Sequence, residues 1–321
     1  MGIKKIAVLT TGGDAPGMNA AIRAVVRTAI ANKIDVIGVF RGWWGLINEE
    51  LKPLTHRSVS GIINEGGTIL KTQRCPEFIT PEGMERAAQT IKKNNIDGII
   101  VIGGNGSFTA AHEFYKKHNV PCIGIPASID NDVNGFDATI GVDTAINTAL
   151  MAIDNIRDTA TSMERIFVVE VMGRESGFIA LMVALADGCE DVIIPEKKFD
   201  CQEMCHRIVD GNIRGKASWI IVVAEGAGKA EKIARQITEV TSLDTRAVVL
   251  GHIQRGGRPT AVSRNMALRL GYEAVIRLRD GESDKAVGFH SSKIICIDLE
   301  ETIKKKPWGM ETAYNLIKIL T

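Results

Sequence analysis

A pair of carboxylates follows a strongly apolar run in the middle of the chain. Asp130 and Asp132 flank Asn131 in the sequence PASIDNDVNG (126–135). On an extended segment, side chains two residues apart point the same way, so both carboxylates could face one site. One could accept a proton from a substrate hydroxyl while the other holds a metal or orients the first. A cluster of Asx turns is the structural alternative, but the position after a buried run favours function.

Two glycine-rich stretches could hold phosphates. TTGGDAPGMNAAIR (10–23) carries Gly12 and Gly13, and VIGGNGSFTAA (101–111) carries the run from Gly103 to Ser107. Glycine lets the backbone approach a ligand closely, and a helix that starts there offers its first N–H groups to an anion. The first stretch has the spacing of neither a Walker A loop nor a dinucleotide fingerprint. A tight turn between strand and helix is therefore an alternative for both.

Cationic residues follow other apolar runs. Arg174 comes directly after VVEVMG, where a guanidinium could clamp a phosphate through two hydrogen bonds. LGHIQRGGRPT (250–260) carries His252, Arg255 and Arg258, although Arg258 could lie on a solvated loop and His252 could be a packed histidine. Glu225 could accept a hydrogen bond from a sugar hydroxyl. Together these loops indicate phosphoryl transfer to a sugar phosphate.

The elements that must position these loops alternate between strands and helices. Continuous Val, Ile and Leu runs indicate strands that are buried on both faces, which is typical of parallel sheets covered by helices. We expect an α/β fold of two doubly wound lobes with mainly parallel sheets and an active-site cleft between them. The expected strands lie in 4–10, 34–40, 96–104, 120–126, 165–173, 190–196, 217–226 and 245–252, and three expected helices span 18–31, 81–94 and 262–279. Residues 286–303 predict one or two strands followed by a helix.

Composition excludes several classes of function. The chain has 321 residues, is 45% hydrophobic and 24% charged, and carries a net charge of +1, so no global field favours nucleic acid or a membrane. No signal peptide and no membrane span are indicated, and we expect a cytoplasmic protein. The cysteines are scattered and should be reduced and structural, including Cys201 and Cys205, which with His206 supply too few ligands for a metal.

The motifs together resemble the bacterial ATP-dependent 6-phosphofructokinases. TGGDAPGMNAAIR, RCPEF, SIDND, EVMGR, AEG and GHIQRGG occur in that family's order and spacing over essentially the whole chain. The resemblance implies transfer of the γ-phosphoryl group of Mg-ATP to the 1-hydroxyl of fructose 6-phosphate, giving fructose 1,6-bisphosphate and ADP in glycolysis. It also implies a homotetramer. Its domains would be a larger ATP-binding one (1–140 and 254–304) and a smaller sugar-phosphate-binding one (141–253 and 305–321).

The same resemblance implies roles for individual residues. Asp130 matches the general base and Asp132 supports it, while Ser128 stands where a threonine usually contacts the transferred phosphoryl group. Gly13, Arg74 and Arg174 match residues that stabilise that group. The ATP side would be lined by Gly13, Arg74, Cys75, Phe78, Gly104, Asn105, Gly106 and Ser107.

Two further sets of residues follow from the resemblance. The sugar-phosphate pocket would comprise Ser128, Asp130, Asp132, Met172, Gly173, Arg174, Glu225, His252 and Arg255, with Arg165 and Arg246 reaching the 6-phosphate in a neighbouring subunit. An effector site for ADP or phosphoenolpyruvate would comprise Arg23, Arg27, Arg157, Glu190, Arg214 and Lys216. Arg23 and Arg27 lie four residues apart on one helix face, which could equally be a solvated face. His56 and Gly61 stand where the family has an arginine and an aspartate, which weakens the prediction of effector control.

Asn105 is the main departure from the family, which carries an aspartate there to help hold Mg²⁺. Asn105 could still ligate a metal weakly beside Asp132, but without charge. We expect an aspartate at position 105 to raise turnover or to lower the Mg²⁺ requirement. Gly106 and Ala127 favour ATP over pyrophosphate, because pyrophosphate-dependent relatives usually carry an aspartate and a lysine at these positions. Ala127 replaces a glycine of the ATP-dependent family.

Two other functions stay open at the level of sequence. The chain could phosphorylate another ketose phosphate, such as tagatose 6-phosphate or sedoheptulose 7-phosphate, with the same phosphate loops. It could also be a catalytically weakened paralogue that senses nucleotides, which Asn105 suggests and which the retained Asp130, Arg174 and Arg255 argue against.

Overall fold

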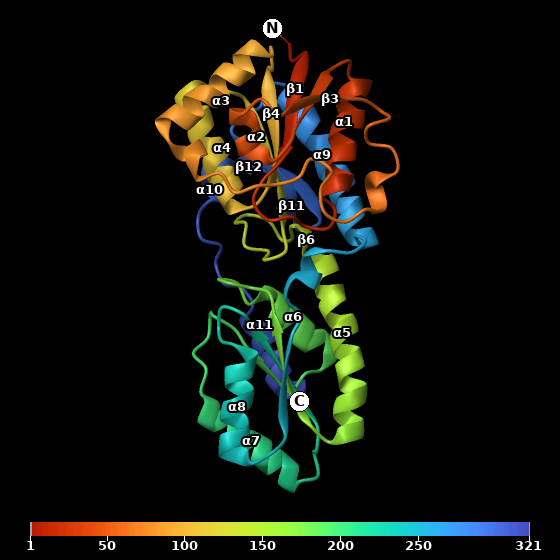
Figure 1. The fold of residues 1–321 in the computed structure, drawn as a ribbon, viewed down its shortest axis with the longest axis vertical. Helices are drawn as coiled ribbons and strands as arrows, with labels where there is room; N and C mark the ends of the chain where they lie inside the picture. Colours follow the sequence, from red (N-terminus) through yellow and green to blue (C-terminus); the bar gives the residue numbers. More distant parts are fainter. Residues whose placement is uncertain (1, 321) are drawn as a thin grey trace. The chain divides into compact units, whose positions relative to one another are not determined.

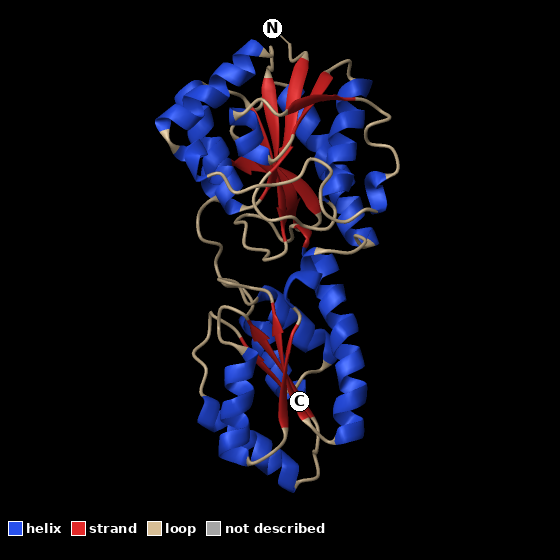
Figure 2. Cartoon of the chain, viewed as in Figure 1, coloured by secondary structure: helices blue, strands red, loops and turns tan. Residues whose placement is uncertain are grey.

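The computed structural model describes residues 2–320, and within it the chain divides into two compact units. Unit 1 comprises Met1–Thr144 and Arg255–Lys306, and unit 2 comprises Ala145–Gln254 and Pro307–Thr321. The chain therefore passes from one unit to the other three times. Both units are α/β, as the colouring by secondary structure shows (Figure 2). The nucleotide and sugar-phosphate roles expected for two domains stay predictions.

Unit 1 is built on a mainly parallel sheet (Figure 1). Its strands are ordered β12-β11-β5-β4-β1-β2-β3, and β6 pairs with β5. The strands are β1 (Lys5–Thr10), β2 (Asp35–Val39), β3 (Leu51–Leu54), β4 (Gly98–Gly103), β5 (Cys122–Ser128), β6 (Ile140–Gly141), β11 (Lys285–His290) and β12 (Lys293–Asp298). The helices are α1 (Met18–Ala31), α2 (Gly42–Ile47), α3 (Pro81–Lys93), α4 (Asn105–His118), α9 (Ala261–Arg279) and α10 (Leu299–Thr302), with short 3₁₀ turns at Ile62–Asn64 and Pro76–Ile79.

The faces of this sheet explain the continuous apolar runs. In β1, Ala7 and Leu9 join a buried cluster with Met84 of α3 and Phe108 of α4. Ile6 and Val8 are equally buried on the opposite face, where α1 and α9 pack (Figure 1). A strand covered on both faces needs apolar side chains at every position, so its sequence does not alternate.

Unit 2 has a smaller, fully parallel sheet in the order β10-β7-β9-β8. Its strands are β7 (Ile166–Val171), β8 (Asp191–Ile193), β9 (Trp219–Ala224) and β10 (Thr245–Val249). Its helices are α5 (Val142–Met163, entering from unit 1), α6 (Phe178–Asp187), α7 (Cys201–Ile213), α8 (Ala230–Thr241) and α11 (Glu311–Leu320), and a 3₁₀ turn at Gly251–Arg255 leads back to unit 1. Helices α7 and α8 bury Ile208 and Ile233 against Ile221 and Val223 of β9.

The expected doubly wound α/β class is confirmed. Seven of the eight expected strands contain an observed one, and the eighth, 120–126, overlaps β5, which runs two residues further to Ser128. The expected helices 18–31, 81–94 and 262–279 correspond to α1, α3 and α9 within one residue at each end. Two edge strands depart from the parallel pattern, because β3 pairs antiparallel with β2 and β12 pairs antiparallel with β11. All six cysteines are free. Among residues 2–320, no helix combines the length and apolar character that a membrane span requires.

The hairpin between β11 and β12 turns through two serines. Ser291 and Ser292 both have positive φ, at 49° and 64°. Two-residue hairpin turns require this conformation at both central positions, and glycine or asparagine usually supplies it. The Ser291 N–H donates to Asp137 Oδ2 at 2.6 Å, which ties the turn to the loop after β5.

Candidate active site

A cavity of about 390 Å³ opens in unit 1 where β1, β4 and β5 end. Ligands of open α/β sheets sit at this edge, and the volume lies within the range of ligand pockets. The lining includes three stretches after these strands, a loop before α3 and one arginine near the start of α9. Its residues are Thr11, Gly12, Gly13, Trp43, Gln73, Arg74, Cys75, Pro76, Phe78, Ile79, Gly104, Asn105, Gly106, Ser107, Ala110, Ala127, Ser128, Ile129, Asp130, Asp132 and Arg255.

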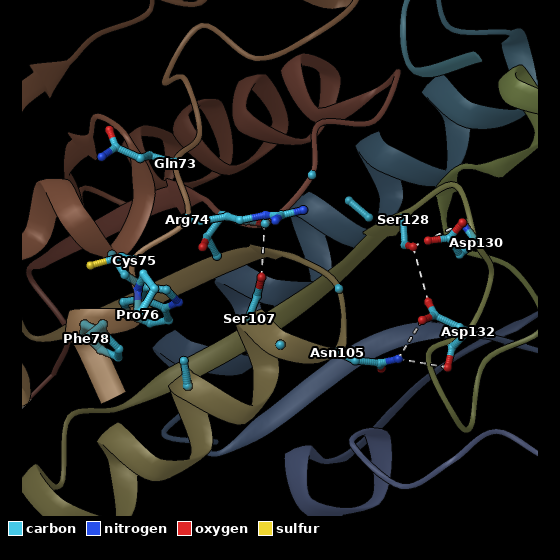
Figure 3. A pocket seen from close by; sticks show the side chains of 18 of the residues that line it. Gln73, Arg74, Cys75, Pro76, Phe78, Asn105, Ser107, Ser128, Asp130 and Asp132 are labelled. Carbon is cyan, nitrogen blue, oxygen red and sulfur yellow. Dashed lines mark hydrogen bonds between the residues drawn. The ribbon is translucent and has the colours of Figure 1, made fainter. Parts of the chain in front are cut away.

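The glycine-rich stretches form the close backbone turns that their sequences indicate. A Cβ on Gly103 would lie 2.4 Å from Ser107 Oγ, so this turn admits no side chain there. Ser107 Oγ donates to the Thr11 carbonyl at 3.1 Å, which joins the turn after β4 to the end of β1 (Figure 3). Gly106 differs, because a Cβ there would meet no atom within 4 Å. The fold therefore does not require glycine at 106, and its small size leaves space beside the cavity.

Arg255 lies against the first glycine stretch. A Cβ on Gly13 would fall 2.3 Å from Arg255 Nη1, and that nitrogen donates to the Asp14 carbonyl at 3.0 Å. Gly13 thus makes room for a guanidinium that lines the same cavity as Asp130. The carboxylate of Asp14 is 4.0 Å from Arg255 Nη1, so Asp14 and Arg255 do not form a close ion pair.

The carboxylate loop after β5 brings Asp130 and Asp132 to this cavity. The prediction that these two residues lie on an extended segment is wrong, because Asn131 between them has a positive φ of 50°. Asn131 is buried, and its amide donates to the Asp137 carbonyl at 3.0 Å, which stabilises this left-handed conformation. Ser128 Oγ accepts from the Asp130 N–H at 3.2 Å and donates to Asp132 Oδ1 at 3.3 Å. The serine therefore orders the loop around both carboxylates (Figure 3).

Asn105 points its side chain at the same loop. Its amide nitrogen donates to Asp132 Oδ2 at 2.9 Å and to the Asp132 carbonyl at 3.2 Å (Figure 3). Both partners can only accept, so the orientation of the amide is set by the network. The carbonyl oxygen Oδ1 of Asn105 is buried and has no hydrogen-bond partner among residues 2–320. An unpartnered buried oxygen beside a carboxylate is suited to a cation or to a ligand donor.

These two residues fit a magnesium ion that is shared with a nucleotide. Asn105 Oδ1 and the Asp132 carboxylate are oxygen donors, which Mg²⁺ prefers, and Mg²⁺ usually takes only one or two protein ligands and completes its shell with phosphates and water. No group of three or more His, Cys, Asp or Glu residues suited to a metal occurs in the described part of the chain. The protein alone therefore offers too few ligands for a dedicated metal cage.

Lys306 is a residue of this site that sequence reasoning missed. Its ammonium donates to the Asn131 carbonyl at 3.0 Å and to the Phe136 carbonyl at 2.8 Å, so it holds both ends of the loop that carries Asp132. Burial lowers the pKa of Lys306, and the charges of Asp132 and Asp137 partly offset that effect. Lys306 ends a run of three lysines, which is ordinarily a solvated pattern, so the sequence offered no signal.

The loop before α3 places three predicted nucleotide-side residues differently. Arg74 is exposed at the cavity, whereas Phe78 is fully buried and stacks on Trp43 with ring centroids 4.1 Å apart. Phe78 therefore contributes to the floor of the cavity rather than an exposed stacking surface. Burial raises the pKa of the Cys75 thiol, which keeps it protonated at neutral pH.

Unit 2 places the remaining predicted sugar-phosphate residues at two opposite ends of its sheet. Met172, Gly173 and Arg174 follow β7, Glu225 follows β9 and His252 follows β10, so these residues share the carboxyl edge. The loops after β7 and β9 interlock there, since the Gly226 N–H donates to the Gly173 carbonyl at 3.0 Å. Arg174 and His252 are exposed on these loops.

Arg165 and Arg246 lie at the amino edge of the same sheet. Arg165 precedes β7 and Arg246 is the second residue of β10. Both bind one carboxylate, because Asp244 accepts from Arg165 Nε at 2.7 Å and from Arg246 Nε at 3.0 Å. The strand between the two edges has six residues, or roughly 20 Å. One sugar phosphate cannot contact both edges of a single unit 2.

The predicted effector residues form two groups, one in each unit. In unit 1, Arg23 and Arg27 of α1 are half-buried, their Nε atoms have no hydrogen-bond partner among the described residues, and burial together with the Arg27 charge lowers the pKa of Arg23. In unit 2, Lys216 pairs with Glu190 at 3.2 Å, Arg157 pairs with Asp187, and Arg214 is exposed. The partial burial of these two cations argues against an ordinary solvated face.

The fold and the cavity define a protein that binds phosphorylated ligands at the carboxyl ends of parallel strands. The sequence model of the family "Phosphofructokinase" matches residues 5–278. A curated ATP-dependent 6-phosphofructokinase from Thermotoga neapolitana is 50% identical over 319 residues, covering 99% of this chain and 100% of the relative. One from Halothermothrix orenii is 49% identical with the same coverage. The chain belongs to the phosphofructokinase family.

Solved structures agree with this assignment. Phosphofructokinase from Saccharomyces cerevisiae is 35% identical with a TM-score of 0.88, covering 98% of this chain and 47% of the yeast chain. That from Pichia pastoris in the T-state is 34% identical with a TM-score of 0.89, covering 100% and 37%. This chain thus spans less than half of either yeast chain. A pyrophosphate-dependent phosphofructokinase from Marinobacter aquaeolei, 22% identical with a TM-score of 0.87, shares the fold.

Proposed function

We propose that this protein transfers the γ-phosphoryl group of ATP to the 1-hydroxyl of fructose 6-phosphate, giving fructose 1,6-bisphosphate and ADP. The observation that carries the proposal is one cavity lined by Asp130, Asp132, two glycine-rich turns and Arg255. Relatives that are about half identical over nearly the whole chain and bear the name ATP-dependent 6-phosphofructokinase support the choice of donor and acceptor. The cytoplasm stays the predicted compartment.

The chemistry divides among the residues as follows. Asp130 accepts the proton of the attacking sugar hydroxyl, and Ser128 orients the loop that presents it. The backbone N–H groups after β1 and β4 hold the nucleotide phosphates. Arg74, Arg174 and Arg255 provide positive charge for the transferring group, which is stabilised mainly by positioning and electrostatics.

Magnesium would be held by Asp132 and by Asn105 Oδ1 together with phosphate oxygens. When bound, it neutralises charge that develops on the β- and γ-phosphates. The role of the protein is to keep both oxygen donors at the nucleotide end of the cavity, which Ser128 and Lys306 support through the loop after β5.

The space beside Gly106 favours ATP over pyrophosphate, because a side chain there would project into room that a nucleotide can use.

The contacts to the sugar phosphate are assigned to unit 2, the smaller of the two units. Its carboxyl-edge residues Met172, Gly173, Arg174, Glu225 and His252 would bind the sugar of the same chain's site. Arg165 and Arg246, at the opposite edge, would bind the 6-phosphate in another subunit. A homotetramer provides such shared sites, and Asp244 would release the two arginines to the phosphate.

We also propose an effector site formed mainly by cationic residues. Arg23 and Arg27, with Arg157, Arg214, Lys216 and Glu190, would bind ADP or phosphoenolpyruvate. The half-buried guanidinium groups of α1, whose Nε atoms have no hydrogen-bond partner within residues 2–320, support an anion there. Activity measured against fructose 6-phosphate with and without each effector tests this, and Arg23→Ala should remove the response without lowering the maximal rate.

A coupled assay tests the main proposal directly. Purified protein is supplied with ATP or pyrophosphate and with fructose 6-phosphate, tagatose 6-phosphate or sedoheptulose 7-phosphate. We expect the highest kcat/KM with ATP and fructose 6-phosphate. A preference for another sugar would favour the second ketose-phosphate function. ATP binding without turnover on any sugar would favour the nucleotide-sensing function that the uncharged Asn105 suggests.

A further inference from the structure

The side chain of Asn105 carries out two different tasks with its two ends. The carbonyl oxygen is buried and has no partner in the part of the chain that the structure describes, whereas the amide nitrogen makes two hydrogen bonds to one residue, Asp132. One of these bonds reaches the carboxylate and the other the backbone carbonyl. The amide therefore fixes both the side chain and the main chain of Asp132 at once.

An aspartate in the same place would reverse the interaction. Its second oxygen would stand where the amide nitrogen now lies, 2.9 Å from Asp132 Oδ2. Two carboxylates so close repel each other strongly unless a cation lies between them. The same aspartate oxygen would also face the backbone carbonyl of Asp132, which lies 3.2 Å from the present amide nitrogen. That carbonyl can only accept a hydrogen bond, so it would repel the oxygen.

We propose that Asn105 is a positioning residue that makes the Asp130–Asp132 loop independent of metal, because its amide occupies the place where a second carboxylate would need a cation. The loop is then ordered before nucleotide and Mg²⁺ arrive, because Asn105, Ser128 and Lys306 each hold it by hydrogen bonds. The expected effect on turnover rests on the proposed function, whereas the expected effect on the stability of the metal-free protein does not.

The sequence-based expectation for Asn105→Asp considered the metal alone. The structure adds an opposing effect, because the extra carboxylate strengthens metal binding but repels Asp132 when no metal is present. Asn105→Asp should therefore increase the dependence of the folded protein on Mg²⁺, whatever it does to the rate at saturating metal.

Thermal unfolding of the full chain provides the first test. In EDTA at neutral pH we expect Asn105→Asp to unfold at least about 3 °C below the unchanged protein. Millimolar Mg²⁺ should restore most of that loss while moving the unchanged protein much less.

Two further variants separate this mechanism from simple damage. The exchanged pair Asn105→Asp with Asp132→Asn restores one amide facing one carboxylate, and should recover most of the unfolding temperature in EDTA. Asn134→Asp is the matched control, since Asn134 in the same loop donates its amide to the Glu301 backbone carbonyl at 2.9 Å and its removal should give no Mg²⁺-dependent change. Asn105→Ala, which adds no charge, should lower stability without creating a Mg²⁺ response.

The proposal is overturned if Asn105→Asp unfolds like the unchanged protein in EDTA, or if its loss of stability is the same with Mg²⁺ and in the exchanged pair. These outcomes are read without substrate, so they are distinct from a failure of the proposed kinase activity. Where the activity is present, Asn105→Ala should lower kcat several-fold more than it changes the KM for fructose 6-phosphate, because it loosens the base rather than the sugar pocket.

Discussion

Asp130 is the residue on which the proposed chemistry depends most. Asp130→Ala removes the proton acceptor and should lower kcat by about 10²-fold or more while changing sugar binding little. Steady-state kinetics and sugar-phosphate binding measured by calorimetry check both parts. Asp137→Asn is the matched control, because Asp137 lies in the same loop but its carboxylate faces Ser291 and His290. An equal loss in the two variants would show that loop damage, rather than the missing base, lowers the rate.

Gly103 and Gly106 lie three residues apart and should respond oppositely to substitution. A Cβ at position 106 would meet no atom within 4 Å, so Gly106→Asp should leave the free energy of unfolding within about 0.5 kcal/mol. It should lower kcat/KM for ATP at least tenfold by filling nucleotide space. Gly103→Ala places a methyl group against Ser107 Oγ and the Thr11 carbonyl, and should cost about 1–3 kcal/mol of unfolding free energy. Chemical denaturation and kinetics with ATP test the pair. Unchanged ATP use by Gly106→Asp would contradict the assignment of this space to the nucleotide.

At the scale of elements, Lys306 links the segment after α10 to the loop after β5. Lys306→Met removes two donors to buried carbonyl groups, and we expect kcat to fall several-fold as the loop loosens. Lys305→Met, on the exposed neighbour, should leave kcat within about twofold. A normal kcat in Lys306→Met would show that the loop is held sufficiently by Ser128 and Asn105.

The same lysine predicts a pH dependence of stability. Burial lowers its pKa in the folded protein below the ordinary 10.5, so between those two values the unfolded chain binds more protons than the folded one. The free energy of unfolding should therefore contain a contribution that rises with pH through that alkaline window. Urea unfolding as the pH approaches 10.5 should show a smaller rise, or a steeper fall, in Lys306→Met than in the unchanged protein. Parallel curves for the two proteins would contradict this.

The helices and strands could be predicted from the sequence where a single physical cause, such as burial on both faces, determines the pattern of residues. Continuous apolar runs predicted the buried parallel strands, and the chemistry was expected at their carboxyl ends because that is where parallel sheets leave backbone groups and loops together. The left-handed Asn131 could not be predicted, since its conformation depends on a hydrogen bond from its side-chain amide to the Asp137 carbonyl in the same loop. The Ser291–Ser292 turn lacked the usual glycine, and Lys306 looked solvated. These features arise from tertiary contacts.

At the scale of the whole molecule, the two edges of the unit 2 sheet predict that active sites are shared between subunits. The Asp130→Ala variant lacks the general base, and the Arg246→Ala variant lacks the arginine that is expected to bind the 6-phosphate in a neighbouring subunit. When the two inactive variants are unfolded, mixed in equal amounts and refolded, roughly a quarter of the normal activity should return, because half the pairs are mixed and half their sites are intact. No recovery, in mixtures shown to contain hybrids by mass, would mean that Arg246 serves its own chain.

The order of strands in unit 1 has a consequence for biosynthesis. β11 pairs with β5 in the middle of the sheet, yet it follows all of β7 to β10 along the chain. A ribosome therefore makes the whole sheet of unit 2 before it delivers the partner of β5. During that interval, β6 pairs with Ala127 and Ser128, but Ile123 and Gly124 lack the partner that β11 later supplies. This part of an apolar strand is an unpaired edge prone to join another chain. The nascent protein should need protection there, by a chaperone or by fast synthesis, until residue 298 completes the sheet.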